Sequence, residues 1–385
     1  MIKCIICSSA RLSKFIKKGD FISVSSDGSK LFKSQNTFLC KKCNFFFKEL
    51  NNSYKLKIKN LYGSYKLYKK TLGETKLFSI YFNKLLTRTD ILSKLIIDEK
   101  FLKPNQKLLD YGCGNGNFLE KISKTKANNL FYGLEIENRN LRKLEYHRKI
   151  KKIFIKNIDK IDSKFDFITM IHVLEHVENL NKEIKKIHSL LKENGKLLIQ
   201  VPNLSENFLD FITFDHIYHF NDLNIINIMK NHDFILFKKL KLINKEITLI
   251  FQKKEIKNNV RNIYKKKVYN TYNKNFKDFI KYLNRFVAHN EIKGIFGAGQ
   301  KSIFLINNLK NKNQIEFFTD EDKNKINKLF LNKMVFYPTK LKNRPNVLLF
   351  DTKKIFNLAK RKYPNIKFIH LDCSLKFFAK LNVQK

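Results

Sequence analysis

The sequence predicts an α/β fold built on a doubly wound, mainly parallel sheet. Between residues 87 and 254, short apolar segments typical of strands alternate with longer segments typical of helices. Alternation of this kind builds a parallel sheet that helices cover. A glycine-rich turn follows the first strand, where the chain must turn sharply into a helix. A similar pattern starts again near residue 291, so we expect two α/β units.

Changes in composition divide the 385 residues into five segments. This length is comfortable for two domains and a small appendage. The expected segments are a cysteine-bearing unit (1–50), a polar, tyrosine-rich connector (51–86), the first α/β unit (87–254), a charged, helix-prone linker (255–290) and the second α/β unit (291–385).

The first α/β unit opens with an expected helix over Asp90–Phe101, which ends before Pro104. The expected strands are Lys107–Asp110, Leu130–Glu135, Lys152–Ile155, Phe165–Ile171 and Gly195–Val201. The expected helices are Asn115–Lys124, one that runs to Tyr146, Leu180–Leu191 and Asp222–Asn231. Two last strands, Phe234–Leu240 and Ile247–Gln252, lie close in the sequence, which favours an antiparallel pair at the edge of the sheet.

The second α/β unit begins with a strand over Ile292–Phe296, a turn at Gly297–Gly299 and a helix over Lys301–Leu309. Further strands are expected at Ile315–Phe318, Val347–Phe350 and Lys367–His370. The pattern is Rossmann-like. It does not predict NAD here, because Ser302 stands where a Gly-x-Gly-x-x-Gly motif has its third glycine.

The net charge of +43 would suit a polyanionic partner. Lysine is interleaved with asparagine and isoleucine along the whole chain, which indicates a substitution bias and argues against a nucleic-acid surface. A phosphorylated small substrate also fits a basic surface. The chain has no apolar run of about 18 residues and no signal-peptide pattern, so we expect a cytoplasmic protein without a membrane partner.

Four of the six cysteines form two pairs with the spacing Cys-x-x-Cys. In a cytosolic protein such pairs favour a metal over a disulfide. Four thiolates suit tetrahedral Zn²⁺ and close its coordination shell, which predicts a structural ion. The alternatives are cysteines that hold no metal and a unit with a binding role. The expected ligands are Cys4, Cys7, Cys40 and Cys43.

The strand Lys107–Asp110 leads into Gly112-Cys113-Gly114-Asn115-Gly116 and then a helix. Glycines let the backbone approach a ligand, and the helix N-terminus offers free N–H groups to an anion. Glu135 ends the next strand, about twenty residues on, where a carboxylate accepts ribose hydroxyls. The pattern predicts a nucleotide-type cofactor, with NAD as one option.

The stretch Asp110–Gly116 resembles the D-x-G-x-G-x-G signature of class I S-adenosylmethionine (SAM) methyltransferases. Phe165–Ile168 and His172–Val177 look like the fourth-strand region of that family, and Asn157-Ile158 occupies its adenine-contacting position. The alternative is a similar core without SAM. The cofactor-binding residues that the resemblance implies are Asp110, Gly112, Cys113, Gly114, Gly116, Glu135, Asn157, Ile158 and His172.

The stretch Thr213–Phe220 follows the fifth strand, near the edge where ligands bind in such sheets. His216 is the expected general base, with Asp215 orienting it or raising its basicity. His219 is a second candidate. The alternative is an aromatic loop that packs over the site. We expect Glu175 and His176 to cap or orient a helix.

Taken together, the four-cysteine unit, the class I core, the Asp215-His216 loop and the C-terminal unit resemble deoxysugar C-methyltransferases. The stretches Tyr62-x-x-Tyr65 and Gly297-Ala298-x-x-Lys301 extend this resemblance along the chain. It implies a nucleotide-linked keto sugar as substrate and methylation of an enolate carbon. It also implies a C-terminal domain that helps to hold the substrate.

The loop departs from the pattern of that family, because Thr213 stands where the family has a tyrosine. Methylation of an oxygen or nitrogen therefore stays open. An RNA methyltransferase that grips RNA with the zinc unit is the alternative activity, and a binding protein without activity is a third reading. We expect a monomer or a dimer.

Overall fold

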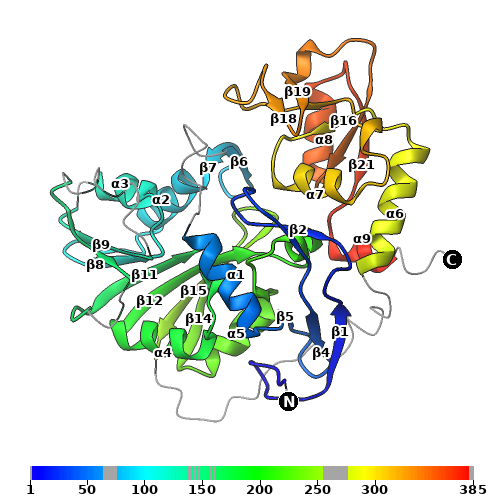
Figure 1. The fold of residues 1–385 in the computed structure, drawn as a ribbon. Helices are drawn as coiled ribbons and strands as arrows, with labels where there is room; N and C mark the ends of the chain where they lie inside the picture. Colours follow the sequence, from blue (N-terminus) through cyan, green and yellow to red (C-terminus); the bar gives the residue numbers. More distant parts are fainter. Residues whose placement is uncertain are drawn as a thin grey trace.

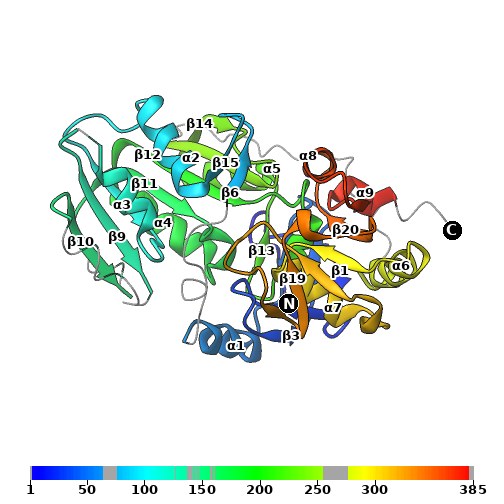
Figure 2. The same cartoon turned by 90° about the horizontal axis from the view of Figure 1, so that it is seen from above.

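The computed structural model describes residues 2–63, 76–125, 127–136, 141, 144, 147–156, 158, 161–254 and 276–380. Its strands form a seven-stranded, a six-stranded and a four-stranded sheet, with two small hairpins besides. The seven-stranded sheet lies on one side of the molecule and the six-stranded sheet on the other, with the N-terminal strands beside both (Figure 1). The view turned by 90° separates the same two bodies (Figure 2).

The seven-stranded sheet has the order β10-β9-β8-β11-β12-β15-β14. Five neighbouring strands run parallel, whereas β15 is antiparallel to both of its neighbours. The order reverses between β8 and β11, which is where ligands bind outside the carboxyl ends of the strands. The strands are β8 (Lys107–Tyr111), β9 (Leu130–Glu135), β10 (Ile150–Ile155), β11 (Phe165–Ile171), β12 (Leu191–Pro202), β14 (Phe234–Leu240) and β15 (Glu246–Lys253).

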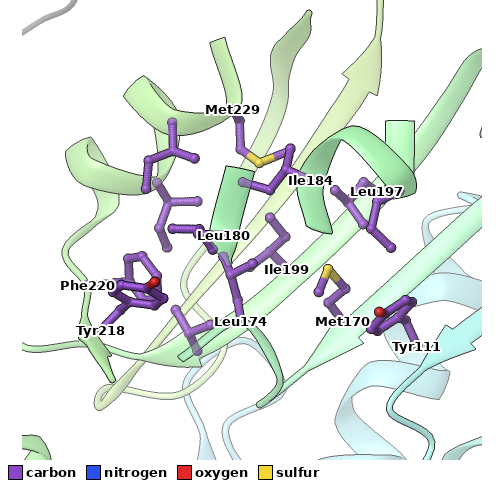
Figure 3. Close-up of a cluster of buried hydrophobic side chains, with 14 of the residues drawn as sticks. Tyr111, Met170, Leu174, Leu180, Ile184, Leu197, Ile199, Tyr218, Phe220 and Met229 are labelled. Atoms are coloured by element: carbon purple, nitrogen blue, oxygen red, sulfur yellow. The ribbon is translucent and has the colours of Figure 1, made fainter. Parts of the chain in front are cut away.

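Helices cover both faces of this sheet. Helices α2 (Arg88–Asp98) and α3 (Asn117–Ser123) share one apolar cluster with it, and α1 (Asn52–Tyr62), α4 (Leu180–Leu190) and α5 (Asp222–Lys230) share another. In Figure 3, Leu180 and Ile184 of α4 and Met229 of α5 pack against Leu197 and Ile199 of β12. A hairpin of β6 (Lys76–Ser79) and β7 (Lys84–Thr87) precedes α2.

The six-stranded sheet has the order β18-β19-β17-β16-β20-β21, and all neighbouring strands pair parallel except β18 and β19, which pair antiparallel. Its five parallel strands follow the same chain-order pattern, 3-2-1-4-5, as the parallel strands of the larger sheet. The strands are β16 (Gly294–Phe296), β17 (Phe317–Thr319), β18 (Leu329–Phe330), β19 (Lys333–Phe336), β20 (Asn346–Phe350) and β21 (Lys367–Leu371). The helices are α6 (Phe276–His289), α7 (Gln300–Asn308), α8 (Lys353–Lys362) and α9 (Leu375–Lys380).

The N-terminal unit completes its sheet with a strand from far along the chain. The order is β1-β4-β5-β13, and β13 (Tyr218–His219) pairs antiparallel with β5 (Phe46–Lys48). The other strands are β1 (Leu12–Ile16), β4 (Thr37–Cys40) and the separate hairpin of β2 (Ile22–Val24) and β3 (Leu31–Lys33).

Two side chains of the N-terminal region fasten the stretch just before β13. The Lys48 ammonium group donates to the carbonyl oxygens of Thr213 and Phe214. The Tyr54 hydroxyl also donates to the Phe214 carbonyl, at 2.5 Å. Burial lowers the pKa of Lys48 to about 7. The loop that carries His216 is therefore held by buried polar contacts as well as by strand pairing.

An aromatic cluster joins the N-terminal unit to the C-terminal unit. Phe21, Phe208 and Phe276 belong to one buried core together with Phe304 and Phe378. The ring centroids of Phe21 and Phe276 lie 4.5 Å apart, and those of Phe208 and Phe378 lie 4.9 Å apart. Phe208 stands on a 3-10 turn, η4 (Phe208–Ile212), so the segment that leads to His216 is also anchored to the C-terminal unit.

The predicted α/β class, with a mainly parallel sheet and an antiparallel closing pair, is confirmed. The expected strands of the first unit are present within a few residues; β12 begins four residues early, at Leu191. The expected helix to Tyr146 and most of the linker to residue 275 lie outside the described residues. The prediction missed α1 within the connector and β19 and α8 within the second unit. No helix in the described part of the chain has the length and apolar character to cross a bilayer.

Replacing Lys48 by methionine is expected to destabilise the fold, because it leaves the Thr213 carbonyl without this donor in a buried place. The free energy of unfolding should fall by about 2 kcal/mol in a urea titration. Lys57→Met on the exposed side of α1 is the matched control and should change it by no more than about 0.5 kcal/mol. Equal effects of the two changes would contradict a special role of Lys48.

Candidate active site

The turn from β8 into α3 is built around three glycines in the left-handed region. The φ angles of Gly112, Gly114 and Gly116 are +76°, +57° and +75°. A Cβ atom on Gly112 would lie 2.4 Å from the Val173 side chain, and one on Gly116 would lie 2.2 Å from Leu144. Only glycine fits these positions, so the loop backbone is free to lie directly against a ligand.

The Glu135 carboxylate lies at this loop, at the carboxyl end of β9. The Gly114 N–H donates to one carboxylate oxygen at 2.6 Å, and the Ile136 N–H donates to the other at 2.7 Å. The side chain is partly exposed. Strand, glycine turn and acidic residue thus form the arrangement that receives a ribose and an anionic group in nucleotide sites.

Asp110 points into the protein rather than toward solvent. It is 2% exposed and accepts a hydrogen bond of 2.7 Å from the Thr169 hydroxyl on β11. Burial raises the pKa of Asp110 to about 7. Cys113 is also buried, and burial raises the pKa of its thiol. Both residues shape the loop from beneath.

The remaining expected cofactor residues are Asn157, Ile158 and His172, and the structure describes two of the three. Asn157 lies outside the described residues, whereas Ile158 is partly buried and packs against the main apolar core. His172 directly follows β11 and has a φ of +54°, and β11 is the strand next to β8, which leads into the glycine turn. Residues from β8, β9 and β11 therefore meet at the same edge of the sheet.

His172 belongs to a buried ionic network. Its Nδ1 atom lies 3.1 Å from the Glu175 carboxylate and its Nε2 atom 3.4 Å from Glu246, which also pairs with Arg88 at 2.5 Å. Burial and the Arg88 charge lower the pKa of His172, but Glu246 and Glu175 outweigh them and raise it to about 9. His172 is thus held as a cation between two carboxylates.

Asp210, and not Asp215, is the carboxylate that contacts the ring of His216. Its two oxygens lie 2.5 Å from Nδ1 of His216 and 2.5 Å from Nδ1 of His219. Burial lowers the pKa of His216, but Asp210 outweighs it, so the pKa lies above its usual value. Burial lowers the pKa of His219 to about 4. His219 is fully buried, whereas His216 keeps a small exposed area.

His176 stands beside His216, and their ring centroids lie 4.7 Å apart. The Nδ1 atom of His176 lies 2.9 Å from the Tyr62 hydroxyl and 3.0 Å from the Asp215 carbonyl oxygen. The Asp215 carboxylate accepts hydrogen bonds from the backbone N–H and the hydroxyl of Ser26, at 2.8 and 2.5 Å. Asp215 therefore ties the loop to the N-terminal hairpin.

Sequence reasoning missed three members of this cluster. Asp210 precedes His216 by six residues on a 3-10 turn, so no simple helical or strand period links them. Tyr62 comes from α1. The expectation that His176 only caps or orients a helix left out its contact with His216. The Tyr62-x-x-Tyr65 stretch was the one available signal for Tyr62; Tyr65 lies outside the described residues.

The four N-terminal cysteines come together as one cluster, with every sulfur atom within 4.8 Å of the others. The Sγ atoms of Cys4 and Cys43 lie 3.4 Å apart, and those of Cys7 and Cys40 lie 3.5 Å apart. Tetrahedral Zn–S bonds of about 2.3 Å require sulfur separations of about 3.8 Å. The donor set and its spacing therefore fit a tetrahedral metal ion.

The C-terminal unit repeats the loop geometry of the first unit. Gly297 has a φ of +98°, and a Cβ atom on Gly297 or Gly299 would meet no atom within 4 Å. The Ala298 N–H donates to the Asp320 carboxylate at the end of β17, at 2.8 Å. The Gln300 amide at the start of α7 donates to the Thr213 hydroxyl at 3.1 Å, which connects this loop with the His216 loop.

A second contact between the two units lies at Asp351. Lys245 and Lys301 both pair with this carboxylate, and Lys301 also donates to the Phe350 carbonyl at 3.0 Å. Burial raises the pKa of Asp351, but the two lysines outweigh it and hold the pKa well below its usual range. Two lysines, one from each unit, thus meet a single carboxylate at this junction.

The raised pKa of His172 predicts a loss of stability at alkaline pH. Its stabilising contribution is complete below the unfolded pKa of about 6.5 and is lost as the pH rises through about 9. About a quarter of the side chain is exposed, so we expect an effect on the order of 2 kcal/mol. Urea unfolding at pH 6 and pH 9.5 should show this loss in the native chain and not in His172→Gln. His289→Gln, which changes an exposed histidine, is the control and should lose as much stability between pH 6 and pH 9.5 as the native chain. An equal loss in all three proteins would show that His172 is not the group responsible.

Comparison with known proteins agrees with this geometry. A ubiquinone biosynthesis O-methyltransferase of Pelagibacter ubique (strain HTCC1062) is 33% identical over 116 residues, which cover 29% of this chain and 47% of that protein. N-methyltransferase 4 of Papaver somniferum is 29% identical over 113 residues, covering 26% of this chain and 31% of that one. The chain thus spans half or less of the length of these two relatives.

Among solved structures, magnesium protoporphyrin IX methyltransferase (ChlM) of Synechocystis PCC 6803 with bound SAH aligns with a TM-score of 0.36 and 16% identity, over 43% of this chain and 81% of that one. Residues 82–238 match the family model of the methyltransferase domain. The match includes the glycine turn, Glu135 and the loop with His216. Residues 82–238 are a SAM-dependent methyltransferase domain of class I.

Proposed function

We propose that this chain transfers the methyl group of SAM to a carbon atom of a nucleotide-linked keto sugar. The observation that carries the proposal is the pair His176 and His216. It lies on loops that follow β11 and β12 of the sheet whose β8 leads into the glycine turn. C-methylation beside a carbonyl needs a base in addition to a cofactor site.

The residues of the glycine turn and Glu135 fit SAM. At Gly112 and Gly116 a side chain would collide with Val173 and Leu144, so glycine lets the backbone of the turn lie against the cofactor, and the Glu135 carboxylate would accept ribose hydroxyls. Among the other expected residues that the structure describes, Ile158 would line the adenine and His172 would close the edge of the site. When bound, SAM supplies a methyl group that is already electrophilic.

His216 acts as the base in this proposal. Its free nitrogen takes a proton from the carbon beside the carbonyl, and the electron pair of the C–H bond forms an enolate. The enolate carbon would then be nucleophilic toward the methyl group that bound SAM would supply. Asp210 holds Nδ1 of His216 and stabilises the imidazolium that results. Asp215 contributes by fixing the loop on Ser26.

The C-terminal unit would hold the nucleotide part of the substrate. The glycines at 297 and 299 leave open space beside the loop, and Lys245 and Lys301 bring positive charge near the junction with the methyltransferase domain. A pyrophosphate is attracted by both features. The contact between Gln300 and Thr213 supports a shared site, because it connects this loop with the His216 loop.

Mass spectrometry with isotope-labelled SAM and a panel of keto-sugar nucleotides tests the proposal. We expect methyl incorporation on a carbon beside the keto group. His216→Asn should lower turnover by at least 100-fold and keep SAM affinity within a few-fold, since the glycine turn is unchanged. In the native enzyme, turnover should rise with pH through a pKa above the usual histidine value.

Exposed His289→Asn is the matched control and should behave as the native enzyme. Methyl incorporation into RNA, with none into any sugar nucleotide, would replace the proposal by RNA methylation. Full turnover in His216→Asn would remove His216 from the role of the base.

We also propose that Cys4, Cys7, Cys40 and Cys43 bind a structural Zn²⁺ ion. The cluster is mostly buried, and its sulfur spacing suits tetrahedral thiolate ligation. Cys40 and Cys43 flank the turn between β4 and β5, so the ion would fix the strand that pairs with β13.

Elemental analysis of the purified protein is expected to find tightly bound zinc, and Cys43→Ser should lose it and unfold at a lower temperature, because three thiolates hold the ion more weakly than four. Cys373→Ser, which changes a buried cysteine outside the cluster, is the control and should retain the zinc. A zinc content that Cys43→Ser leaves unchanged would exclude this site.

A further inference from the structure

The proposed base and two side chains beside it share the geometry of a metal site. Glu175, His176 and His216 each offer one donor atom, and these atoms all lie within 4.8 Å of one another. The four-cysteine cluster meets the same distance. Glu175 and His176 stand on a 3-10 turn that follows β11, and His216 lies on the loop two residues before β13.

Both imidazole rings are oriented by hydrogen bonds at Nδ1. His216 uses this atom toward Asp210, and His176 uses it toward the Tyr62 hydroxyl and the Asp215 carbonyl oxygen. The nitrogen that remains for a ligand is therefore Nε2 in both rings. Metal-binding histidines usually have such an arrangement, in which a carboxylate or a carbonyl holds the other ring nitrogen.

The third donor has an unused oxygen. Glu175 is fully buried, and one of its oxygens lies 3.1 Å from Nδ1 of His172. Its Oε2 atom is buried without a hydrogen-bond partner among the residues that the structure describes. A buried carboxylate oxygen without a partner is costly. Burial raises the pKa of Glu175, but the three surrounding histidines outweigh it and leave the pKa below its usual value.

We infer that Glu175, His176 and His216 bind a divalent first-row transition-metal ion, such as Zn²⁺ or Co²⁺. Two imidazoles and one carboxylate suit these ions, whereas Mg²⁺ and Ca²⁺ prefer oxygen ligands. Three protein ligands leave a coordination position open, unlike the closed shell of four cysteines. The site therefore differs from the N-terminal cluster in its ligands and in having a coordination position that a water molecule or another ligand can occupy.

Occupancy of this site has a consequence that rests on the proposed function. The metal ion and the substrate proton would both need Nε2 of His216. An enzyme with this site filled has no free base, so an excess of Zn²⁺ or Co²⁺ should inhibit methyl transfer. Zinc that stays in the cysteine cluster would not interfere.

Titration with Co²⁺ tests the site without any substrate. Protein that retains its cysteine-bound metal should take up one further equivalent of Co²⁺, seen by calorimetry and by the visible absorption bands of the ion. Glu175→Gln should weaken this uptake at least tenfold. Glu178→Gln, the same change three residues away on a half-exposed side chain, should leave it unchanged. His176→Asn is the second variant, should Glu175→Gln fail to fold.

Absence of a further equivalent in the native chain would overturn the site, and so would undiminished uptake by both Glu175→Gln and His176→Asn. Inhibition of methyl transfer at the Co²⁺ concentration that fills the site would support competition between the metal ion and the substrate proton for Nε2 of His216. Stimulation at that concentration would instead overturn His216 as the base, while the metal site would stand. Failure of the proposed function is thus separable from failure of this inference.

Discussion

The pairing of β5 with β13 is the interaction on which the site depends. It adds a strand of the methyltransferase domain to the sheet of the N-terminal unit. Lys48 and Tyr54 reinforce it by donating to carbonyl groups just before His216. The proposed base is therefore positioned by an element outside the methyltransferase domain, and a metal ion at the cysteines would influence its position through β5.

Buried carboxylates set the charge of the histidines around the site. Asp210 bridges His216 and His219, while Glu175 and Glu246 enclose His172. The outcomes differ because burial opposes each carboxylate to a different degree: the pKa of His172 rises and that of His219 falls. One small region thus contains His172 with its pKa raised to about 9, His219 with its pKa lowered to about 4, and His216 with a pKa above its usual value.

Local patterns in the sequence were sufficient to predict the strands and the glycine turn. The alternation of side chains along a strand and the requirement of a tight turn for glycine both involve only a few consecutive residues. They also predicted that Glu135 lies near the glycine turn, because the carboxyl ends of neighbouring parallel strands lie at one edge of a sheet. The contacts around His216 were not accessible in this way. Asp215 is adjacent in sequence and yet points to Ser26, whereas Asp210 reaches the ring because a 3-10 turn folds it back. Long-range packing, which brings Tyr62 to His176, leaves no periodic trace in the sequence.

The late arrival of β13 has a consequence for biosynthesis. Lys48 and its carbonyl partner at Thr213 are 165 residues apart, so β5 leaves the ribosome long before its partner strand exists. Until then β5 is an open edge with two adjacent phenylalanines, Phe46 and Phe47, and unpaired edges of this kind attract other chains. Until the methyltransferase domain has emerged, this edge of the nascent N-terminal unit is therefore exposed to pairing with other chains.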